Sequence, residues 1–449
     1  MAKGRKNKGT KRATHTGERD PETLARLAAA ARAEGNLVLA LQLHNRALAR
    51  RPRDAGHLNG LGITHGALGR LEEAVASFER AVAADPTLMP AWFNLGSAHE
   101  RRGELQAARD AYAAARAAAP DNEAAAYNLG GVLMRLDEPE AAVEAFMAAI
   151  AARPDFGAAW GNLGAARRLL GQLAEAEEAL RRALALEPRQ VSAWVNLGLV
   201  LKARGAATEA LAAFESALAL DPAHRTARHM RAALRGETLE PDRGYVAALF
   251  DDYASRYDHS LSVDLGYRVP EALVALLDAA GIGRLDAGLD LGCGTGLLGE
   301  RLRPRLRQLV GVDLSPAMVA RARERAIYDR LVVASLEDYL GGDDVAGAPF
   351  DLVCAADVLV YCGALDALVG GVARASKMGG LWLFSVEAHA GPGDYQLRPS
   401  GRYAHARGYL QRLLEGAGMT PLAIEEASLR LSGGEPVEGE LHLWRRGGS

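Results

Sequence analysis

The sequence predicts a multidomain chain, with an all-α solenoid of helical repeats followed by an α/β domain built on a parallel sheet. Prolines recur every 34 residues through the N-terminal half. From residue 286, short apolar runs alternate with amphipathic stretches, and a glycine-rich loop follows the first run. We therefore expect a basic, disordered tail over residues 1–20, the solenoid over 21–236 and the α/β domain over 241–449.

The composition is that of an ordinary globular protein, with 49% hydrophobic and 24% charged residues among 449. A net charge of -3 gives no overall field that would attract nucleic acid. Three cysteines are too few for a disulfide framework and fit a reducing compartment, so we expect a cytoplasmic protein. Because no apolar run reaches about 18 residues, we expect no membrane span and no membrane partner.

The 34-residue period holds at several positions at once. It relates Pro52, Pro86, Pro120, Pro154, Pro188 and Pro222, and also the Leu-Gly pairs that begin at Leu61, Leu95, Leu129, Leu163 and Leu197. The small residues allow paired helices to approach closely, and each proline ends the second helix of a unit. The pattern resembles the tetratricopeptide repeat family over residues 21–224, which implies six repeats. Residues 225–236 are expected to form a capping helix.

One polar residue also follows the period and is not required for packing. Asparagine recurs just before four of the Leu-Gly pairs, at Asn94, Asn128, Asn162 and Asn196, while Gly60 interrupts the series. An amide side chain offers both a donor and an acceptor, which can bracket a peptide unit. The series is similar to the asparagine ladder of O-GlcNAc transferases, which implies a groove for an extended peptide. The alternative is that each asparagine braces the neighbouring repeat.

The C-terminal half is expected to contain a doubly wound sheet. Strands are predicted over 287–291, 308–312, 331–334, 350–355, 380–386, 421–431 and 440–445. Helices are predicted over 295–304, 315–327, 364–376 and 403–417. Such a sheet binds its ligand beyond the carboxyl ends of the strands.

The glycine loop after the first predicted strand carries the strongest chemical signal. It begins at Asp290 and has glycines at 292, 294 and 296, which permit a tight turn and a close backbone approach. A second predicted strand ends at Asp313, where a carboxylate can accept two ribose hydroxyls. The glycine spacing is not that of the G-x-G-x-x-G loop, which argues against a nicotinamide dinucleotide.

Residues 243–449 resemble a class I S-adenosylmethionine-dependent methyltransferase. The resemblance rests on DLGCGTG (290–296), GVDLSPAMVARARER (311–325), FDLVCAADVLVYCG (350–363) and GGLWLFSVE (379–387). It implies a Rossmann-like fold with S-adenosylmethionine as cofactor and no metal. The implied cofactor-binding residues are Asp290, Gly292, Cys293, Gly294, Gly296, Asp313, Leu314, Met318, Ser335 and Leu336.

The resemblance also implies a part for most of these residues. Gly292, Cys293 and Gly294 would lie under the methionine part of the cofactor. Asp290 would orient the loop or meet the amine, while Asp313 would bind the ribose. Leu314 and Met318 would pack on adenine.

The sequence departs from the family at Ser335, where an acidic residue commonly meets the adenine amine. Glu337 and the backbone of Leu336 are the alternatives. Cys293 is expected to fill space in the loop and not to act as a nucleophile, since the motif holds no base for it.

Acceptor residues are expected in three further segments. Asp357 and Tyr361, after the fourth predicted strand, are the predicted catalytic residues beside the transferred methyl. Their segment is not the Asn/Asp-Pro-Pro-Tyr loop of many N-methyltransferases, which weakens DNA adenine and glutamine amide as targets. Residues 249–273 look like the N-terminal lid of small-molecule methyltransferases. They also resemble predicted methyltransferases that carry tetratricopeptide repeats.

The predicted substrate residues come from that lid segment and from the segment 389–410, which is rich in Gly, Pro, Arg, Tyr and His. They are Tyr253, Tyr257, Arg402, Tyr403 and His405. Loops at the carboxyl ends of strands commonly carry specificity. The alternative for 389–410 is a solvated connector with a helix that begins at 404.

The leading hypothesis is an S-adenosylmethionine-dependent methyltransferase whose repeats recruit a protein partner or a protein substrate. One alternative is a repeat scaffold with a cofactor-sensing or inactive methyltransferase domain. Another is a small-molecule methyltransferase that its repeats oligomerise. The sequence leaves open the acceptor and whether oxygen or nitrogen is methylated.

Overall fold

The computed structural model describes residues 20–237, 242–253, 267–342, 345, 349–432 and 435–447. It separates into two compact units, one that ends at Ala193 and one that begins at Trp194. Tyr257 lies outside the described residues, as does the side chain of Tyr253, so the structure does not report on these two predicted substrate residues.

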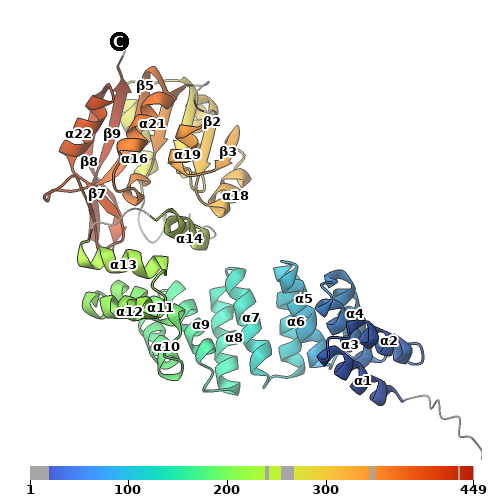
Figure 1. The fold of residues 1–449 in the computed structure, drawn as a ribbon. Coiled ribbons are helices and arrows are strands. Elements are labelled where there is room, and N and C mark those ends of the chain that lie inside the picture. The colour runs from blue at the N-terminus through green and yellow to red at the C-terminus, as the bar shows by residue number, and fades with distance from the viewer. Residues whose placement is uncertain are drawn as a thin grey trace, which may run out of the picture. The chain divides into compact units, whose positions relative to one another are not determined.

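The first unit consists of helices stacked in antiparallel pairs (Figure 1). The pairs are α1 (Pro21–Ala33) with α2 (Leu37–Leu48), α3 (Ala55–Ala67) with α4 (Leu71–Ala84), α5 (Met89–Arg101) with α6 (Leu105–Ala118), α7 (Glu123–Arg135) with α8 (Pro139–Ala152), and α9 (Gly157–Leu169) with α10 (Leu173–Leu186). The 34-residue period therefore corresponds to one helix pair, as the sequence predicts.

Glycine and a large side chain meet inside each of these pairs after the first. A Cβ on Gly62 would lie 2.5 Å from the Phe78 ring, and one on Gly96 would lie 2.8 Å from the Tyr112 ring. The glycine is therefore needed for close helix packing. The turn between the two helices of a repeat contains a left-handed residue, such as Gly103 with φ +78°, and Asp137 takes that place between α7 and α8 with φ +60°.

The second unit begins with the last helical repeat. The units divide within α11 (Val191–Ala203), which is followed by α12 (Ala207–Leu220), α13 (Arg225–Arg235) and α14 (Arg243–Tyr253). Helix α13 is the predicted capping helix, and its amphipathic sequence buries Ala227, Met230 and Ala233.

The rest of the unit is an α/β fold. Its strands are β1 (Leu285–Leu291), β2 (Leu306–Asp313), β3 (Arg330–Val333), β4 (Phe350–Ala355), β5 (Ser376–Ala388), β6 (Tyr395–Leu397), β7 (Tyr403–His405), β8 (Met419–Ser432) and β9 (Glu435–Arg446). Its helices are α16 (Val269–Ala279), α17 (Leu297–Leu302), α18 (Pro316–Glu324), α19 (Leu336–Gly341), α21 (Asp366–Ala375) and α22 (Arg407–Gly416), with the 3-10 turns η2 (Arg303–Arg305) and η3 (Leu359–Tyr361).

Five parallel strands in the order β3-β2-β1-β4-β5 form the centre of the sheet, and the antiparallel strands β9 and β8 extend it beyond β5 (Figure 1). Helices α19, α21 and α22 pack on one face, while α16 and α17 pack on the other. Because the central strands are parallel, their carboxyl ends share one edge, and the loops after β1, β2 and β4 meet there.

The predicted helix over 403–417 is wrong at its start. Residues 403–405 form β7, which pairs with β6 in a hairpin and with the end of β5, and the helix α22 begins at Arg407. Tertiary pairing overrides local helix propensity here. The predicted connector is therefore an ordered hairpin.

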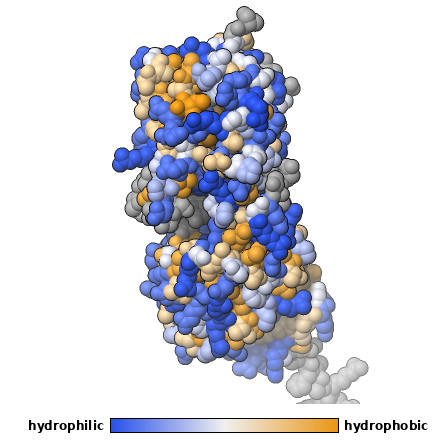
Figure 2. Space-filling view, turned by 90° about the vertical axis from the view of Figure 1, so that its left-hand side faces the viewer, coloured by the Kyte–Doolittle hydropathy of each residue, from blue (hydrophilic) through white to orange (hydrophobic). Residues whose placement is uncertain are grey.

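The surface carries exposed apolar side chains that are widely separated in sequence, such as Val38 and Met378. On the face in Figure 2, hydrophobic residues lie in small groups among hydrophilic ones. Within the described ranges, no helix is long and apolar enough to cross a bilayer.

Candidate active site

The glycine loop joins the end of β1 to the start of α17. Gly292, Gly294 and Gly296 all have positive φ, at +65°, +53° and +97°. A Cβ on Gly292 would lie 2.5 Å from a Val358 methyl group, so the loop has no room for a side chain there. The amide of Cys293 donates to the carbonyl of Val312 at 3.0 Å, which ties the loop to β2.

Asp290 lies at the end of β1, directly under this loop, with 1% of its surface exposed. Burial raises its pKa to about 6. The hydroxyl of Tyr328 donates to its Oδ2 at 2.6 Å and stabilises the charged form. The Tyr328 ring fits only because Gly299 and Gly311 have no side chains in its way.

Asp313 ends β2 and holds the loop from the other side. Its Oδ2 accepts from the Gly294 amide and its Oδ1 from the Ser315 amide, each at 2.8 Å. Burial raises its pKa, which these two amide bonds oppose. A carboxylate oxygen can accept more than one hydrogen bond, so this geometry leaves capacity for a bound hydroxyl.

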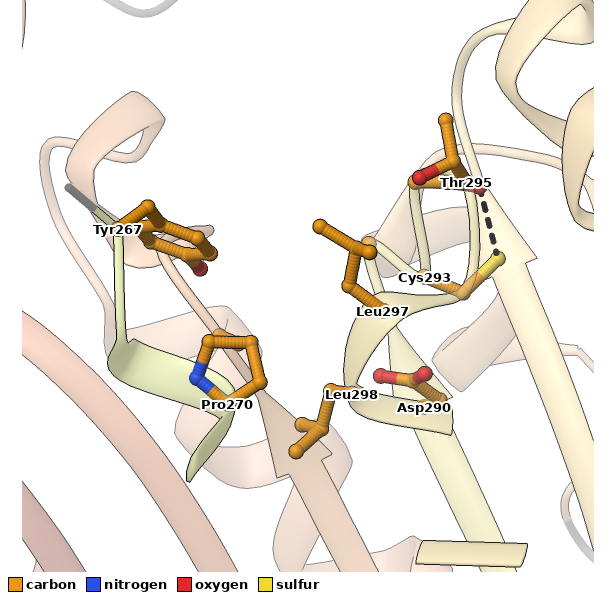
Figure 3. A pocket seen from close by; sticks show the side chains of 10 residues that line it. Tyr267, Pro270, Asp290, Cys293, Thr295, Leu297 and Leu298 are labelled. Carbon is orange, nitrogen blue, oxygen red and sulfur yellow. Dashed lines mark hydrogen bonds between the residues drawn. The ribbon is translucent and has the colours of Figure 1, made fainter. Parts of the chain in front are cut away.

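A pocket opens between the glycine loop and the segment that begins α16. Figure 3 shows Tyr267 and Pro270 on one side, facing Asp290, Cys293, Thr295, Leu297 and Leu298 on the other. Burial raises the pKa of the Cys293 thiol well above its usual range, so the sulfur is protonated at neutral pH. This supports the expectation that Cys293 fills space and is not a nucleophile.

The remaining predicted cofactor residues follow β2 and β3. Leu314 is half-buried and Met318 is fully buried in α18. Ser335 directly precedes α19, and its Oγ accepts from the Asp338 amide at 3.1 Å. Ser335 is thus a helix cap, and Leu336 is the first residue of that helix. Glu337, the proposed substitute, is exposed and pairs with Arg243 of α14 at 3.4 Å.

Helix α14 contacts several of these strand-end loops. Asp251 accepts from the Ser315 hydroxyl at 2.5 Å, next to Asp313. The rings of Phe250 and Tyr361 pack edge to face at 5.0 Å. The helix therefore contacts residues that follow β2 and β4. Residues 254–266 of the predicted lid lie outside the described residues. Asp251 is not among the residues that the sequence predicts for the site.

Asp357 follows β4 in a left-handed conformation, with φ +57°. Its Oδ1 accepts from Arg430 at 2.8 Å and its Oδ2 from Arg402 at 3.3 Å. Arg430 also bonds Glu387 on β5, and all three members of this buried cluster come from different strands or strand ends. The cluster fixes Asp357. No residue near Asp357 in the sequence indicates Arg430, which lies 73 residues away.

The structure brings Asp357 and Tyr361, the predicted catalytic pair, next to Arg402. The Arg402 guanidinium carbon lies 5.5 Å from the Tyr361 ring centroid. Burial raises the pKa of the Tyr361 hydroxyl, which therefore keeps its proton at neutral pH. Tyr403 and His405 are each 1% exposed and belong to the interior of the hairpin. Their role in substrate binding stays a prediction.

The asparagine series lies on the first helices of successive repeats. Asn94 on α5 donates to the side chain of Asn59 on α3 at 2.9 Å, and Asn162 on α9 donates to the Tyr127 hydroxyl on α7 at 3.2 Å. These bonds favour the bracing role for two of the four. The series stops at Gly60 because a Cβ there would lie 2.3 Å from the His44 ring.

Comparison with protein-family models divides the chain in the same way. The family described as a methyltransferase domain matches residues 289–380. A tetratricopeptide repeat model matches residues 25–88. A model of the C-terminal domain of cilia and flagella-associated protein 70 matches residues 86–233.

Curated methyltransferases match about a third of the chain. Methyltransferase-like protein 27 of Homo sapiens is 31% identical over 177 residues, which are 37% of this chain and 68% of that protein. Malonyl-[acyl-carrier protein] O-methyltransferase of Enterobacter lignolyticus is 32% identical over 147 residues, which are 33% of this chain and 55% of that enzyme. The chain thus spans about half the length of this second relative.

Solved structures resemble a part of the chain. The protein MamA is 30% identical, with 36% of this chain and 96% of that chain covered and a TM-score of 0.34. YrrB, a TPR protein with an unusual peptide-binding site, is 22% identical, with 41% of this chain and 96% of that chain covered and a TM-score of 0.39.

Proposed function

The chain belongs to the methyltransferase family that includes human Methyltransferase-like protein 27, and from this we propose that it is a class I enzyme that uses S-adenosylmethionine to methylate a protein-borne acceptor. The tetratricopeptide repeats ahead of the methyltransferase domain are proposed to recruit that protein. The observation that carries the proposal is the glycine loop held between the buried carboxyl groups of Asp290 and Asp313.

The donor set fits the chemistry of the cofactor. Gly292 and Gly294 have positive φ and line the pocket, so a ligand there would meet backbone and no side chain at these two positions. Asp290 and Asp313 supply acidic groups suited to an ammonium group and to ribose hydroxyls, respectively. When bound, the cofactor supplies a methyl group that its sulfonium has already activated, so the protein needs mainly to position the acceptor.

The chain's own residues can perform this positioning. Asp357 and Tyr361 lie after β4, where the acceptor of a doubly wound sheet is expected, and Arg402 lies against both. The pair of arginines fixes the Asp357 carboxylate, so we propose that it orients the acceptor by accepting a hydrogen bond. Tyr361, which keeps its proton, would donate one.

A protein acceptor is the proposed substrate class for two reasons. Tetratricopeptide repeats are commonly protein-binding modules, and the four asparagines offer amides at a regular spacing on first helices. In addition, the relative from Enterobacter lignolyticus is named for a malonyl group that a carrier protein holds.

The test uses the full chain. Calorimetric titration with S-adenosylhomocysteine should show binding, and the variant Gly292→Ala should bind at least tenfold more weakly because of the Val358 contact. Soluble cell extract should then be incubated with the protein and S-adenosylmethionine labelled in its methyl group. Label in the acid-precipitable protein fraction supports the proposal, whereas label confined to small molecules contradicts a protein acceptor. No binding of S-adenosylhomocysteine contradicts the enzyme itself.

A further inference from the structure

The turn between β6 and β7 is bound to the last helical repeat by two side chains. Lys202 of α11 donates from Nζ to the carbonyl of Ser400 at 3.1 Å. His229 of α13 donates from Nε2 to the carbonyl of Gly401 at 2.8 Å. Both repeat residues and the hairpin belong to the unit that begins at Trp194.

Apolar packing reinforces these two hydrogen bonds. Ala232 and Ala233 of α13 form one buried cluster with Leu397 of β6 and Tyr403 of β7. Small residues on the helix allow the strands to approach it closely. The β6–β7 hairpin therefore packs against the capping helix α13.

The turn itself permits very little variation. Gly401 has φ +88°, and its amide donates to the Arg398 carbonyl at 2.8 Å. A Cβ at this position would lie 2.5 Å from the Met230 methyl group of α13. The backbone is thus held against the helix at the residue that directly precedes Arg402.

Arg402, the next residue, extends from this fixed turn into the candidate active site. Its Nη1 lies 3.3 Å from Asp357 Oδ2, and its guanidinium carbon lies 5.5 Å from the Tyr361 ring centroid. His229 is therefore one residue removed, through the turn, from the side chain that contacts both predicted catalytic residues.

His229 also contacts helix α14. Its ring stacks on Tyr245 of α14, with 4.1 Å between centroids and 20° between planes. Asp251 on that same helix accepts from the Ser315 hydroxyl beside Asp313. One imidazole thus connects α14, which contacts Ser315 beside Asp313, with the turn that carries Arg402.

We propose that the last repeat and its capping helix are a working part of the methyl-transfer site, in which His229 and Lys202 are positioning residues that act through the turn 398–402 on Arg402. In addition to binding a partner, the repeats then position Arg402 beside Asp357 and Tyr361, where the methyl acceptor is proposed to bind. This inference rests on the proposed function for its catalytic consequence.

The first arm of the test measures the turn directly in the full chain bound to S-adenosylhomocysteine. His229→Phe keeps a ring to stack on Tyr245 and removes the donor to Gly401. Hydrogen exchange of the Gly401 amide should then accelerate about tenfold or more. His229→Gln restores an N–H at a similar reach and should return exchange toward that of the unchanged protein. Arg228→Ala, an exposed change on the same helix, is the control and should have no effect.

The second arm asks whether His229 acts through Arg402. Transfer of labelled methyl groups from S-adenosylmethionine to soluble cell extract should fall at least fivefold in His229→Phe and recover in His229→Gln. In an Arg402→Gln background the same His229→Phe change should cause little further loss, because the affected contact is already gone. Affinity for S-adenosylhomocysteine should stay within twofold throughout.

Either of two results overturns the inference. One is unchanged Gly401 exchange in folded His229→Phe, which would show that the helix does not hold the turn. The other is an equal loss of methyl transfer with and without Arg402, which would show that His229 acts elsewhere. If the unchanged protein fails to bind S-adenosylhomocysteine, the proposed function is wrong. The exchange arm, repeated without ligand, then still decides whether the last repeat holds the turn.

Discussion

The Asp313 carboxylate accepts a hydrogen bond from the Gly294 amide at 2.8 Å, so the end of β2 fixes the conformation of the loop that follows β1. Its other oxygen accepts from the Ser315 amide at the start of α18. A single side chain thus joins the two strand ends at which the proposed cofactor binds. This double contact makes Asp313 a structural support of the loop as well as a candidate ligand for ribose.

Replacement of Asp313 by asparagine should therefore weaken cofactor binding strongly. The amide NH₂ of asparagine would face one of the two backbone donors, so one contact is lost along with the charge. Hydrogen bonds to charged groups are worth about 1.5–3 kcal/mol, which corresponds to a fall in affinity of about tenfold or more. Calorimetry with S-adenosylhomocysteine measures this change. Asp286→Asn, at the opposite end of β1 and paired with Arg307, is the control. Equal affinities of the two variants would remove Asp313 from the site.

Cofactor binding should also weaken in acid because of Asp290. Its pKa of about 6 lies above the ordinary value of 3.8, so folding favours the neutral form. That contribution to stability is fully present below pH 3.8 and is lost as the pH rises through 6. The ammonium group of the ligand prefers the charged carboxylate, so the affinity for S-adenosylhomocysteine should fall about tenfold from pH 7 to pH 5.

Tyr328→Phe should move that fall in affinity to higher pH. The Tyr328 hydroxyl stabilises the charged form of Asp290, and its removal raises the pKa of the carboxyl group further. Calorimetric titrations at pH 5, 6, 7 and 8 compare the two proteins, with Tyr112→Phe in the repeats as the control. Identical pH profiles would show that Asp290 does not contact the ligand.

The sequence predicts most of the fold because its main signals are local or periodic. The repeat pattern locates every helix pair of the first unit, and β4 has the bounds that its apolar run predicts. Asp290 and Asp313 are also predictable, since each ends a strand beside a glycine loop or a helix start. Such positions depend on their immediate neighbours along the chain.

The parts that sequence reasoning missed depend on distant partners. Tyr328 lies 38 residues from Asp290 in the sequence. Gly299 and Gly311, which leave room for the Tyr328 ring, are the sequence features that accompany this contact. Arg430 comes from β8 and meets Asp357 only because β9 and β5 bring β8 into the sheet. The β6–β7 hairpin exists because α13 and β5 support it, and neither is near in sequence to the turn it holds.

Arg430→Met should destabilise the second unit severely. Arg430 is 5% exposed and bonds two buried carboxylates, Asp357 and Glu387. Their charges would lose a buried partner, and such a loss typically costs about 3–5 kcal/mol. Urea unfolding measures the change in the free energy of unfolding. The exposed pair of Arg412 with Asp394 offers the matched control, since Arg412→Met should cost less than about 1 kcal/mol. Similar costs for the two variants would contradict the ion-pair account of this cluster.

The asparagine series should contribute to partner binding while it has little effect on folding. Asn94 and Asn162 each lose one partly buried hydrogen bond on mutation to alanine, a cost of about 0.5–1.5 kcal/mol. Alanine returns up to about 0.7 kcal/mol of helix propensity per site. The fourfold variant, which also changes Asn128 and Asn196, should therefore keep its circular dichroism and its affinity for S-adenosylhomocysteine.

Methylation of protein in cell extract should nevertheless fall at least tenfold in the fourfold variant. Labelled S-adenosylmethionine and separation of the acid-precipitable fraction provide the measurement. Asn45→Ala, an exposed change on α2, controls for loss of an amide alone. Undiminished protein methylation with an intact fold would show that the asparagines only brace the repeats.

The first repeat should lose stability in mild acid because His44 on α2 is buried against His57 on α3, in the second repeat. Nδ1 of His44 lies 3.1 Å from Nδ1 of His57, whose Nε2 donates to the Pro21 carbonyl at 2.9 Å. His57 must therefore accept at Nδ1, and His44 must donate there, which leaves Nε2 of His44 as an unprotonated nitrogen. Burial and the neighbouring His57 lower the pKa of His44 to about 4.

The pKa of His44 is lower in the folded protein than the value of 6.5 in the unfolded chain, so protonation of His44 favours unfolding. Stability from the neutral pair is fully present above pH 6.5 and is lost as the pH falls toward 4, by at most about 3 kcal/mol. Hydrogen exchange of residues 21–67 should therefore accelerate between pH 6.5 and pH 4.5, after correction for the intrinsic exchange rate, more than exchange of residues 123–169. His44→Phe, which installs the kind of ring found at Phe78 and Phe146, should remove most of this acid sensitivity. If the variant keeps the full sensitivity, the histidine pair is not its source.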